Sequence, residues 1–133
     1  MNGKVETERI FKFHVRFTYH ESDGVLYSGE SWCIRSRTYI YEQPRETAKQ
    51  FLAFVEGAAL NRWCEHMQDQ YWVHVDKTKV KVSSKAVHEY ESKKELNKEE
   101  RKQFNNVEYT LGSVTKKWVE QEVLRPKQLA SVV

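Results

Sequence analysis

The chain has 133 residues, of which 39% are apolar, 31% charged and 13% aromatic. This length suffices for one buried core, and four Trp, seven Tyr and six Phe argue against intrinsic disorder. No apolar run reaches the roughly 18 residues of a membrane span, and the polar N-terminus lacks a secretory apolar region. Two cysteines do not make a disulfide framework. We therefore expect one domain, residues 1–133, in the cytoplasm and without a membrane partner.

An alternating run over residues 11–19 places aromatic and β-branched side chains at every odd position, which predicts a half-buried strand after a polar tail of residues 1–8. A second strand is predicted over about 26–41, with even positions from Trp32 inward and odd positions from Cys33 outward. Asp23-Gly24 and Ser28-Gly29 are both turn dipeptides, so the two strands are predicted to form an antiparallel hairpin. Which of the two glycines makes the tight turn stays open.

A long helix is predicted to begin at Pro44 and to end near Asp69. Its main apolar stripe has the spacing of a helix face packed on a sheet and consists of Ala48, Phe51, Leu52, Val55, Ala58, Ala59 and Trp63, with Met67 at its margin. A second row, on the opposite side, consists of Ala53, Gly57, Leu60 and Cys64. Small residues four apart admit another backbone, so this row packs either on the C-terminal part of the same chain or on a second copy.

The remainder of the chain is predicted to contain a second hairpin, a charged segment and a short tail. Residues 71–75 and 79–82 are the predicted hairpin strands, because the apolar phase flips between them. Residues 83–106 are predicted as an exposed helix or a mobile loop, with capping-box spacing from Ser92 to Glu95. A strand over 107–111 follows, then residues 114–124 as helix or alternatively strand, and a C-terminal tail over 126–133.

The predicted fold class is α+β. We expect an antiparallel sheet of four to five strands with one long helix packed across one face. The predicted order is ββαββ, then the charged segment and a βα tail.

Motifs for catalysis, metals and cofactors are not found. Cys64 and His66 are two residues apart on the predicted helix and do not face each other, so the pair does not predict an activated thiol. No CxxC, HExxH, GxGxxG or phosphate-loop pattern is present. We therefore expect no enzymatic activity, no metal and no cofactor.

One predicted surface, the outward face of the first hairpin, combines basic and aromatic side chains. Arginines that meet phosphates beside rings that stack on bases are typical of surfaces for single-stranded nucleic acid. The same composition is also typical of the wet face of any antiparallel sheet. The predicted binding residues are Lys12, His14, Arg16, Arg35, Arg37, Tyr39 and Tyr41, extended by Lys79 and Lys81.

Three functions are consistent with these features. The leading hypothesis is a non-enzymatic binding or regulatory protein that contacts an unidentified protein partner, such as the small inhibitors or accessory factors that phages and mobile elements encode, with self-association through the second helical row. The first alternative is a single-stranded nucleic-acid-binding module. The second alternative is an enzyme or small-ligand binder whose pocket the linear sequence does not reveal.

Overall fold

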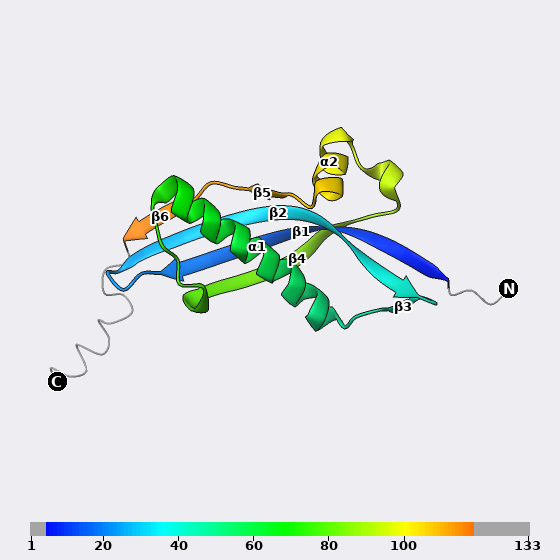
Figure 1. Cartoon of the computed structure of the whole chain (residues 1–133), viewed down its shortest axis with the longest axis horizontal. Helices are drawn as coiled ribbons and strands as arrows, with labels where there is room; N and C mark the ends of the chain where they lie inside the picture. The colour runs from blue at the N-terminus through cyan, green and yellow to red at the C-terminus, as the bar shows by residue number, and fades with distance from the viewer. Residues whose placement is uncertain (1–4, 119–133) are drawn as a thin grey trace.

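The computed structural model describes residues 5–118 and shows an antiparallel sheet with two α-helices (Figure 1). The strands are β1 (Glu6–His20), β2 (Val25–Ile40), β3 (Gln43–Pro44), β4 (Val80–Tyr90), β5 (Tyr109–Leu111) and β6 (Thr115–Trp118). The helices are α1 (Ala48–Tyr71) and α2 (Lys98–Asn106), with short 3₁₀ turns η1 (Lys77–Lys79) and η2 (Lys93–Glu95). The predicted α+β class and antiparallel sheet are confirmed.

Two long strands form the centre of the sheet. β1 and β2 pair antiparallel along their whole length, and the turn between them contains Gly24 at φ +96°. Asp23-Gly24 is therefore the turn dipeptide, whereas Gly29 lies within β2. β4 pairs with the free edge of β1, while β3, β5 and β6 pair in succession along the other edge of β2. The sheet is thus four strands across, and one of its outer positions is filled by three short strands.

α1 begins later than predicted and crosses one face of the sheet (Figure 1). Thr47 caps the helix: its Oγ1 accepts from the Gln50 N–H at 3.1 Å, and the Gln50 side chain accepts from the Thr47 N–H at 3.0 Å. Pro44 lies instead in β3. The predicted stripe is confirmed where it packs on the sheet: the residues of α1 that are buried are Phe51, Val55, Ala59, Trp63 and Met67.

Trp63 packs α1 closely on the sheet. Its ring stacks on the ring of Phe17, with centroids 4.9 Å apart and planes 9° apart. Gly29 is the cross-strand partner of Phe17 in β2, and a Cβ added to it would lie 2.2 Å from Trp63 Nε1. Glycine at this position therefore leaves the space in which the indole rests.

The second helical row does not form one surface. Leu60 and Cys64 are half-buried and pack against the main core, whereas Ala53 and Gly57 are exposed. A Cβ added to Gly57 would meet nothing within 4 Å among the described residues. Only the first half of the row is thus available to a partner.

The predicted hairpin over 71–82 is wrong. α1 ends at the left-handed Trp72, at φ 60°, and an irregular segment leads to η1. Val73 and Val75 are buried in this segment, which explains the strand-like alternation, but no strand pairs with it. Residues 80–82 belong to β4, whose partner is β1.

The charged segment and both ends of the described chain also differ from the predictions. β4 continues to Tyr90, and an edge strand has a largely polar sequence because one side of it meets solvent. Ser92 caps η2, whereas the capping box that starts α2 is formed by Asn97 and Glu100. Residues 115–118 are the strand β6, which was the alternative to the preferred helix, and β1 already begins at Glu6 within the predicted tail. The predictions for 119–124 and 126–133 lie outside the described residues.

Two glycine substitutions test the packing of Trp63 against Gly29. Gly29→Ala should lower the free energy of unfolding by about 2 kcal/mol, because the added methyl displaces the buried indole. Gly57→Ala is the matched control and should raise it by about 0.5–1 kcal/mol, because the methyl meets open space in a helix interior. Urea denaturation of both variants at micromolar concentration measures these changes. Equal effects at the two positions would contradict this account of the packing.

Candidate functional site

The pairing register decides which side chains share a face of the sheet. Directly paired residues of an antiparallel ladder point to the same side. Phe13 pairs with Cys33 on the side that α1 covers, whereas His14 pairs with Trp32 on the other side, where their rings stack 5.0 Å apart. Even positions of β1 therefore face away from α1, and odd positions of β2 face α1.

The predicted binding surface is consequently split between two faces, and its prediction as one outward face is wrong. Lys12, His14 and Arg16 lie on the face away from α1. Arg35, Arg37 and Tyr39 lie on the α1 side. The prediction failed because β2 is covered on both sides: Cys33 packs under α1, and Ile34 packs with a second cluster. A strand buried on both sides has no simple apolar alternation, so its phase cannot be determined from pattern alone.

The three residues on the α1 side have structural contacts. Arg35 is 6% exposed; its guanidinium lies 4.4 Å from the centre of the Tyr109 ring and donates to the Ile34 carbonyl at 2.8 Å. Arg37 donates to the Glu46 carbonyl at 2.8 Å. Tyr39 is buried, with the Arg9 guanidinium 4.3 Å from its ring centre.

Two further predicted residues lie outside the long strands. Tyr41 follows β2 at φ 50°, and Lys79 lies in η1. Of the predicted set, only Lys12, His14, Arg16 and Lys81 share the face away from α1.

The segment from η2 to α2 covers one end of the face away from α1. Leu96 and Phe104 pack there on Ile10, Ile34 and Tyr90. The Tyr90 hydroxyl donates to a Glu100 carboxylate oxygen at 2.5 Å, which fixes α2 to β4. Burial and this hydrogen bond raise the pKa of Tyr90, and hydrogen bonds from the Asn97 N–H and from Tyr90 lower the pKa of Glu100.

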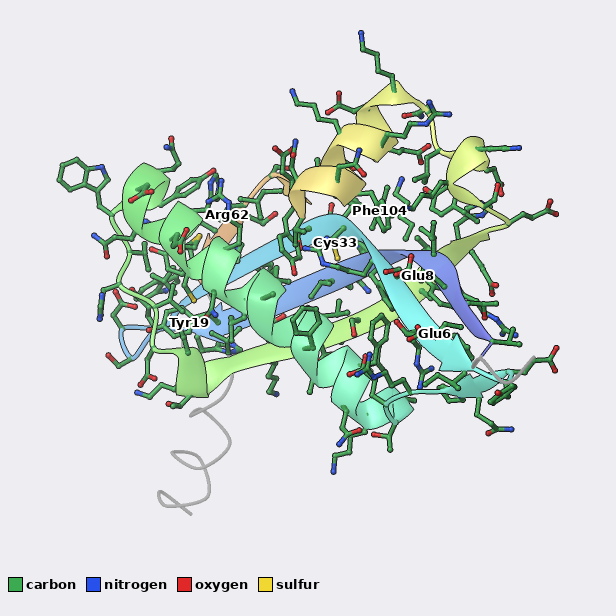
Figure 2. All side chains as sticks on the ribbon, turned by 45° about the vertical axis from the view of Figure 1, so that its right-hand side comes forward. Glu6, Glu8, Tyr19, Cys33, Arg62 and Phe104 are labelled. Atoms are coloured by element: carbon green, nitrogen blue, oxygen red, sulfur yellow. The ribbon has the colours of Figure 1, made fainter. Side chains whose placement is uncertain are left out.

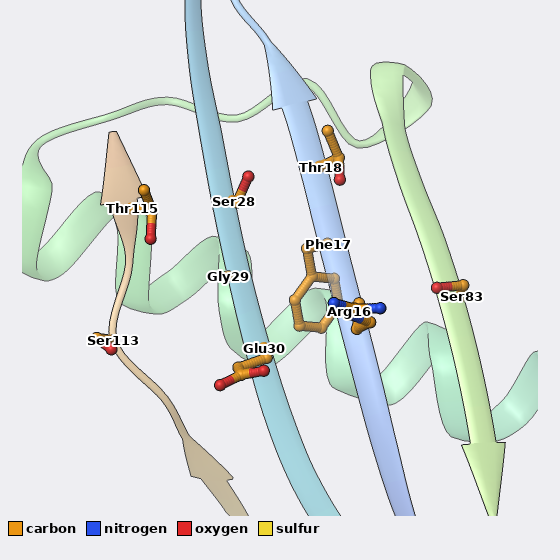
Figure 3. A pocket seen from close by; sticks show the side chains of 9 residues that line it. All are labelled: Arg16, Phe17, Thr18, Ser28, Gly29, Glu30, Ser83, Ser113 and Thr115. Atoms are coloured by element: carbon orange, nitrogen blue, oxygen red, sulfur yellow. The ribbon is translucent and has the colours of Figure 1, made fainter. Parts of the chain in front are cut away.

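The other end of this face is not covered by any element of the described chain, and we call it the open face. It carries a hollow of about 380 Å³, with α1 behind the sheet (Figure 3). The residues of the open face are His14, Arg16 and Thr18 of β1, Ser28, Glu30 and Trp32 of β2, Lys81, Ser83 and Lys85 of β4, and Ser113, Thr115 and Lys117 at or before β6.

The open face has an excess of positive charge around Arg16. The cations are Arg16, Lys81, Lys85 and Lys117, against the single carboxylate Glu30. His14 Nε2 lies 2.8 Å from a carboxylate oxygen of Glu30, so this acid is held by the histidine. Arg16 is exposed and has neither a hydrogen bond nor an ion pair among the described residues. Two other acids of β1, Glu6 and Glu8, lie at the opposite end of the sheet from Tyr19 (Figure 2).

Gly112 packs closely against Glu30, the acid of the open face. Its N–H donates to the Glu30 carbonyl at 2.8 Å, where the chain passes from β5 to β6. A Cβ at this position would lie 2.8 Å from Glu30 Cγ and 3.1 Å from the Trp32 ring. Glycine therefore lets the β5–β6 segment pass close to the pair formed by His14 and Glu30.

The two thiols lack the environment of a nucleophile. Burial raises the pKa of Cys33 to about 11 and also raises the pKa of Cys64, whereas a reactive thiol needs a lowered pKa. Among residues 5–118, no group of three or more His, Cys, Asp or Glu side chains could hold a metal ion. In the same range, no helix combines the length and the apolar composition required to cross a bilayer. The side chains of the open face offer groups for hydrogen bonding and charge pairing.

Sequence reasoning missed more than half of the open face. Ser83 and Lys85 lie in a segment that was predicted as helix or loop, and Thr115 and Lys117 in one for which helix was preferred. The alternation Lys81, Ser83, Lys85 is a period-two pattern and was the available signal for β4. No comparable signal connects β6 with β2, because that pairing joins residues almost 90 apart.

Comparison with known proteins gave no match: neither the models of protein families, nor the curated proteins, nor the solved structures contain one for this chain. The function therefore has to be argued from the site itself.

The hydrogen bond that holds α2 should make stability depend on pH. Because folding lowers the pKa of Glu100, the ionised carboxylate stabilises the fold at pH values above its usual pKa of 4.5. This contribution is lost as the pH falls through the folded-state pKa. Tyr90→Phe should lower the free energy of unfolding by about 2 kcal/mol at neutral pH. The difference from wild type should shrink as the pH falls through the lowered pKa of Glu100 and its carboxylate takes up a proton. A series of urea titrations from neutral to acidic pH measures it, with the exposed Tyr71→Phe as control. A difference independent of pH would exclude the charged hydrogen bond as its cause.

Proposed function

We propose that this protein is a non-enzymatic binding protein whose open face binds single-stranded nucleic acid. The observation that carries the proposal is Arg16, an exposed guanidinium without a described partner at the centre of a polar hollow. The free cysteines Cys33 and Cys64 are consistent with the cytoplasmic location expected for it.

The composition of the open face suits a phosphate backbone. Phosphates accept charge-assisted hydrogen bonds from guanidinium and ammonium groups, and hydroxyl and backbone groups complete the contacts. Arg16 lies on the central strand, with Ser83 as its partner on β4 and Glu30 on β2 (Figure 3). Lys81 and Lys85 lie on either side of Ser83 along β4. The two lysines therefore form a row on the strand next to Arg16. An extended strand of phosphates matches such a row.

A single strand fits this face better than a duplex. Reading a duplex groove takes a helix or a two-stranded ribbon that enters it, whereas an open sheet offers a platform for an extended strand. Trp32, stacked on His14, is the half-buried aromatic side chain beside the hollow and can contact one base.

Charge reversal on the open face should weaken oligonucleotide binding. Arg16→Glu with Lys81→Glu should reduce affinity for labelled single-stranded DNA or RNA at least about tenfold at low salt, because two phosphate contacts become repulsive. The slope of log K against log salt should become about 1.4 less steep, since each single-strand contact contributes about 0.7. Fluorescence anisotropy of nuclease-treated protein across about 50 to 200 mM salt measures both quantities.

The matched control reverses two exposed cations of α1, on the other side of the sheet. Lys49→Glu with Arg62→Glu changes the net charge equally and should leave binding close to wild type. Equal losses in the two double variants would show only a general effect of charge. Absence of wild-type binding at low salt would exclude nucleic acid as the ligand.

Protein contact through α1 is the second candidate, and one observation favours it. Phe54 is 58% exposed on the outer side of α1, beside the exposed Ala53 and Gly57. Residues three and four apart on a helix are neighbours, so Phe54 and Gly57 form a bulky side chain next to a gap. Across a two-fold axis, the Phe54 of each copy would fit into the gap at Gly57 of the other copy. We therefore propose a second copy of the chain as the partner.

Sedimentation velocity tests this self-association. Wild type should sediment as a dimer at high concentration, and Phe54→Glu should sediment as a folded monomer because the substitution buries an unpaired charge in the interface. Gln68→Glu, an exposed position of the same helix, adds the same charge and should leave the dimer intact. A wild-type monomer at high concentration would exclude the proposal.

A further inference from the structure

A second hollow lies on the opposite side of the sheet, between the first turns of α1 and the strands beneath it. Its volume is about 230 Å³, below the roughly 300 Å³ at which sites for drug-sized ligands begin. Its apolar lining comes from Phe11, Phe13, Ala48, Phe51, Leu52 and Ala86, and its polar lining from Arg37, Ser84 and Lys85. The two hollows share no lining residue, although Lys85 of the open face also lines this one.

Two cations, Arg37 and Lys85, line this hollow. The Arg37 guanidinium carbon is 5.5 Å from the centre of the Phe51 ring and 5.6 Å from that of Tyr39, so the group is held between two rings. One terminal nitrogen donates to the Glu46 carbonyl at 2.8 Å. Nε is buried and has no hydrogen-bond partner among the described residues. Nε is therefore closed to a ligand in the hollow, and a bound acceptor would meet the remaining N–H groups of the guanidinium.

Further features favour an anion at the Arg37 end of the hollow. Ala48 is the first residue of α1, so the positive end of the helix dipole lies at the lining. At another part of the lining, Ser84 donates to a carboxylate oxygen of Glu56 at 2.5 Å. That acid disfavours an anionic group beside Ser84, although the cation Lys85 is adjacent there, whereas no carboxylate lines the hollow beside Arg37.

We propose that this hollow binds a small amphipathic carboxylate. The carboxylate accepts from the Arg37 guanidinium, and the apolar body lies on Phe13, Phe51 and Leu52. A guanidinium suits this ligand because its planar donors match the two oxygens of a carboxylate. The volume limits the ligand to one ring or a short alkyl chain, since longer chains would extend into solvent.

Octanoate and octanol are a matched pair of probes for the proposal. Titration calorimetry of the full chain should show octanoate binding at least about tenfold more tightly than octanol, because only octanoate pairs with Arg37. Affinity should rise about threefold to fourfold for each added methylene from hexanoate to octanoate, the increment for burying one methylene. Arg37→Leu should reduce octanoate binding to the level of octanol.

A second variant tests the hollow itself and keeps the proposal independent of Arg37. Ala86→Trp fills the hollow from β4 and should abolish binding of both probes, while Val87→Trp, at an exposed neighbouring position outside the lining, should retain it. Circular dichroism melts verify that each variant is folded, and Ala48→Phe replaces Ala86→Trp if that chain does not fold. Absence of octanoate binding to wild type at millimolar concentration overturns the proposal. Equal affinity for the two probes, or binding that survives Ala86→Trp in the folded chain, also overturns it.

Discussion

The packing of Trp63 against Gly29 and Phe17 is the contact on which the arrangement of α1 and the sheet depends. The indole can approach β2 only because residue 29 has no side chain, and this approach sets the height of α1 above the sheet. With Trp63 in place, Phe51, Val55, Ala59 and Met67 follow at helical spacing along the same stripe. α1 thereby covers one face of the sheet and leaves the other face to the segment from η2 to α2. The division of the molecule into a covered and an open surface follows from this one packing contact.

The same division gives identical residue types different roles. Arg35 lies on the covered side, where its guanidinium stacks on Tyr109 and satisfies backbone carbonyls. Arg37 lies on that side too, but it lines an apolar hollow. Arg16 points to the other side and stands exposed among hydroxyl groups. A basic residue in a strand therefore stabilises the fold or offers a binding group according to the side on which the register places it.

Much of the local structure could be predicted from the sequence, because local structure follows from short-range pattern. The alternation of β1 and the buried stripe of α1 each depend on residues within about one turn or one strand, whereas the choice of Gly24 over Gly29 for the turn stayed open. The phase of β2 could not be predicted, since apolar residues occupy both of its covered faces. β4 was missed because an edge strand has the polar composition of a loop, and β6 because a short exposed strand carries hardly any apolar signal. As a result, only four of the predicted binding residues, Lys12, His14, Arg16 and Lys81, lie on the face away from α1.

By itself, the sequence determined the fold class, the first hairpin and the helix that packs on it, because hydrophobic periodicity and turn chemistry act between near neighbours. Only the tertiary structure decided which side of β2 faces α1, and hence which arginines are exposed. It also decided that Lys85 and Lys117 lie on one face with Arg16, through pairings that join distant parts of the chain. The physical reason is that a one-residue change of phase moves every side chain of a strand to the opposite face. That phase is set by which elements cover the sheet, and the covering elements come from elsewhere in the chain.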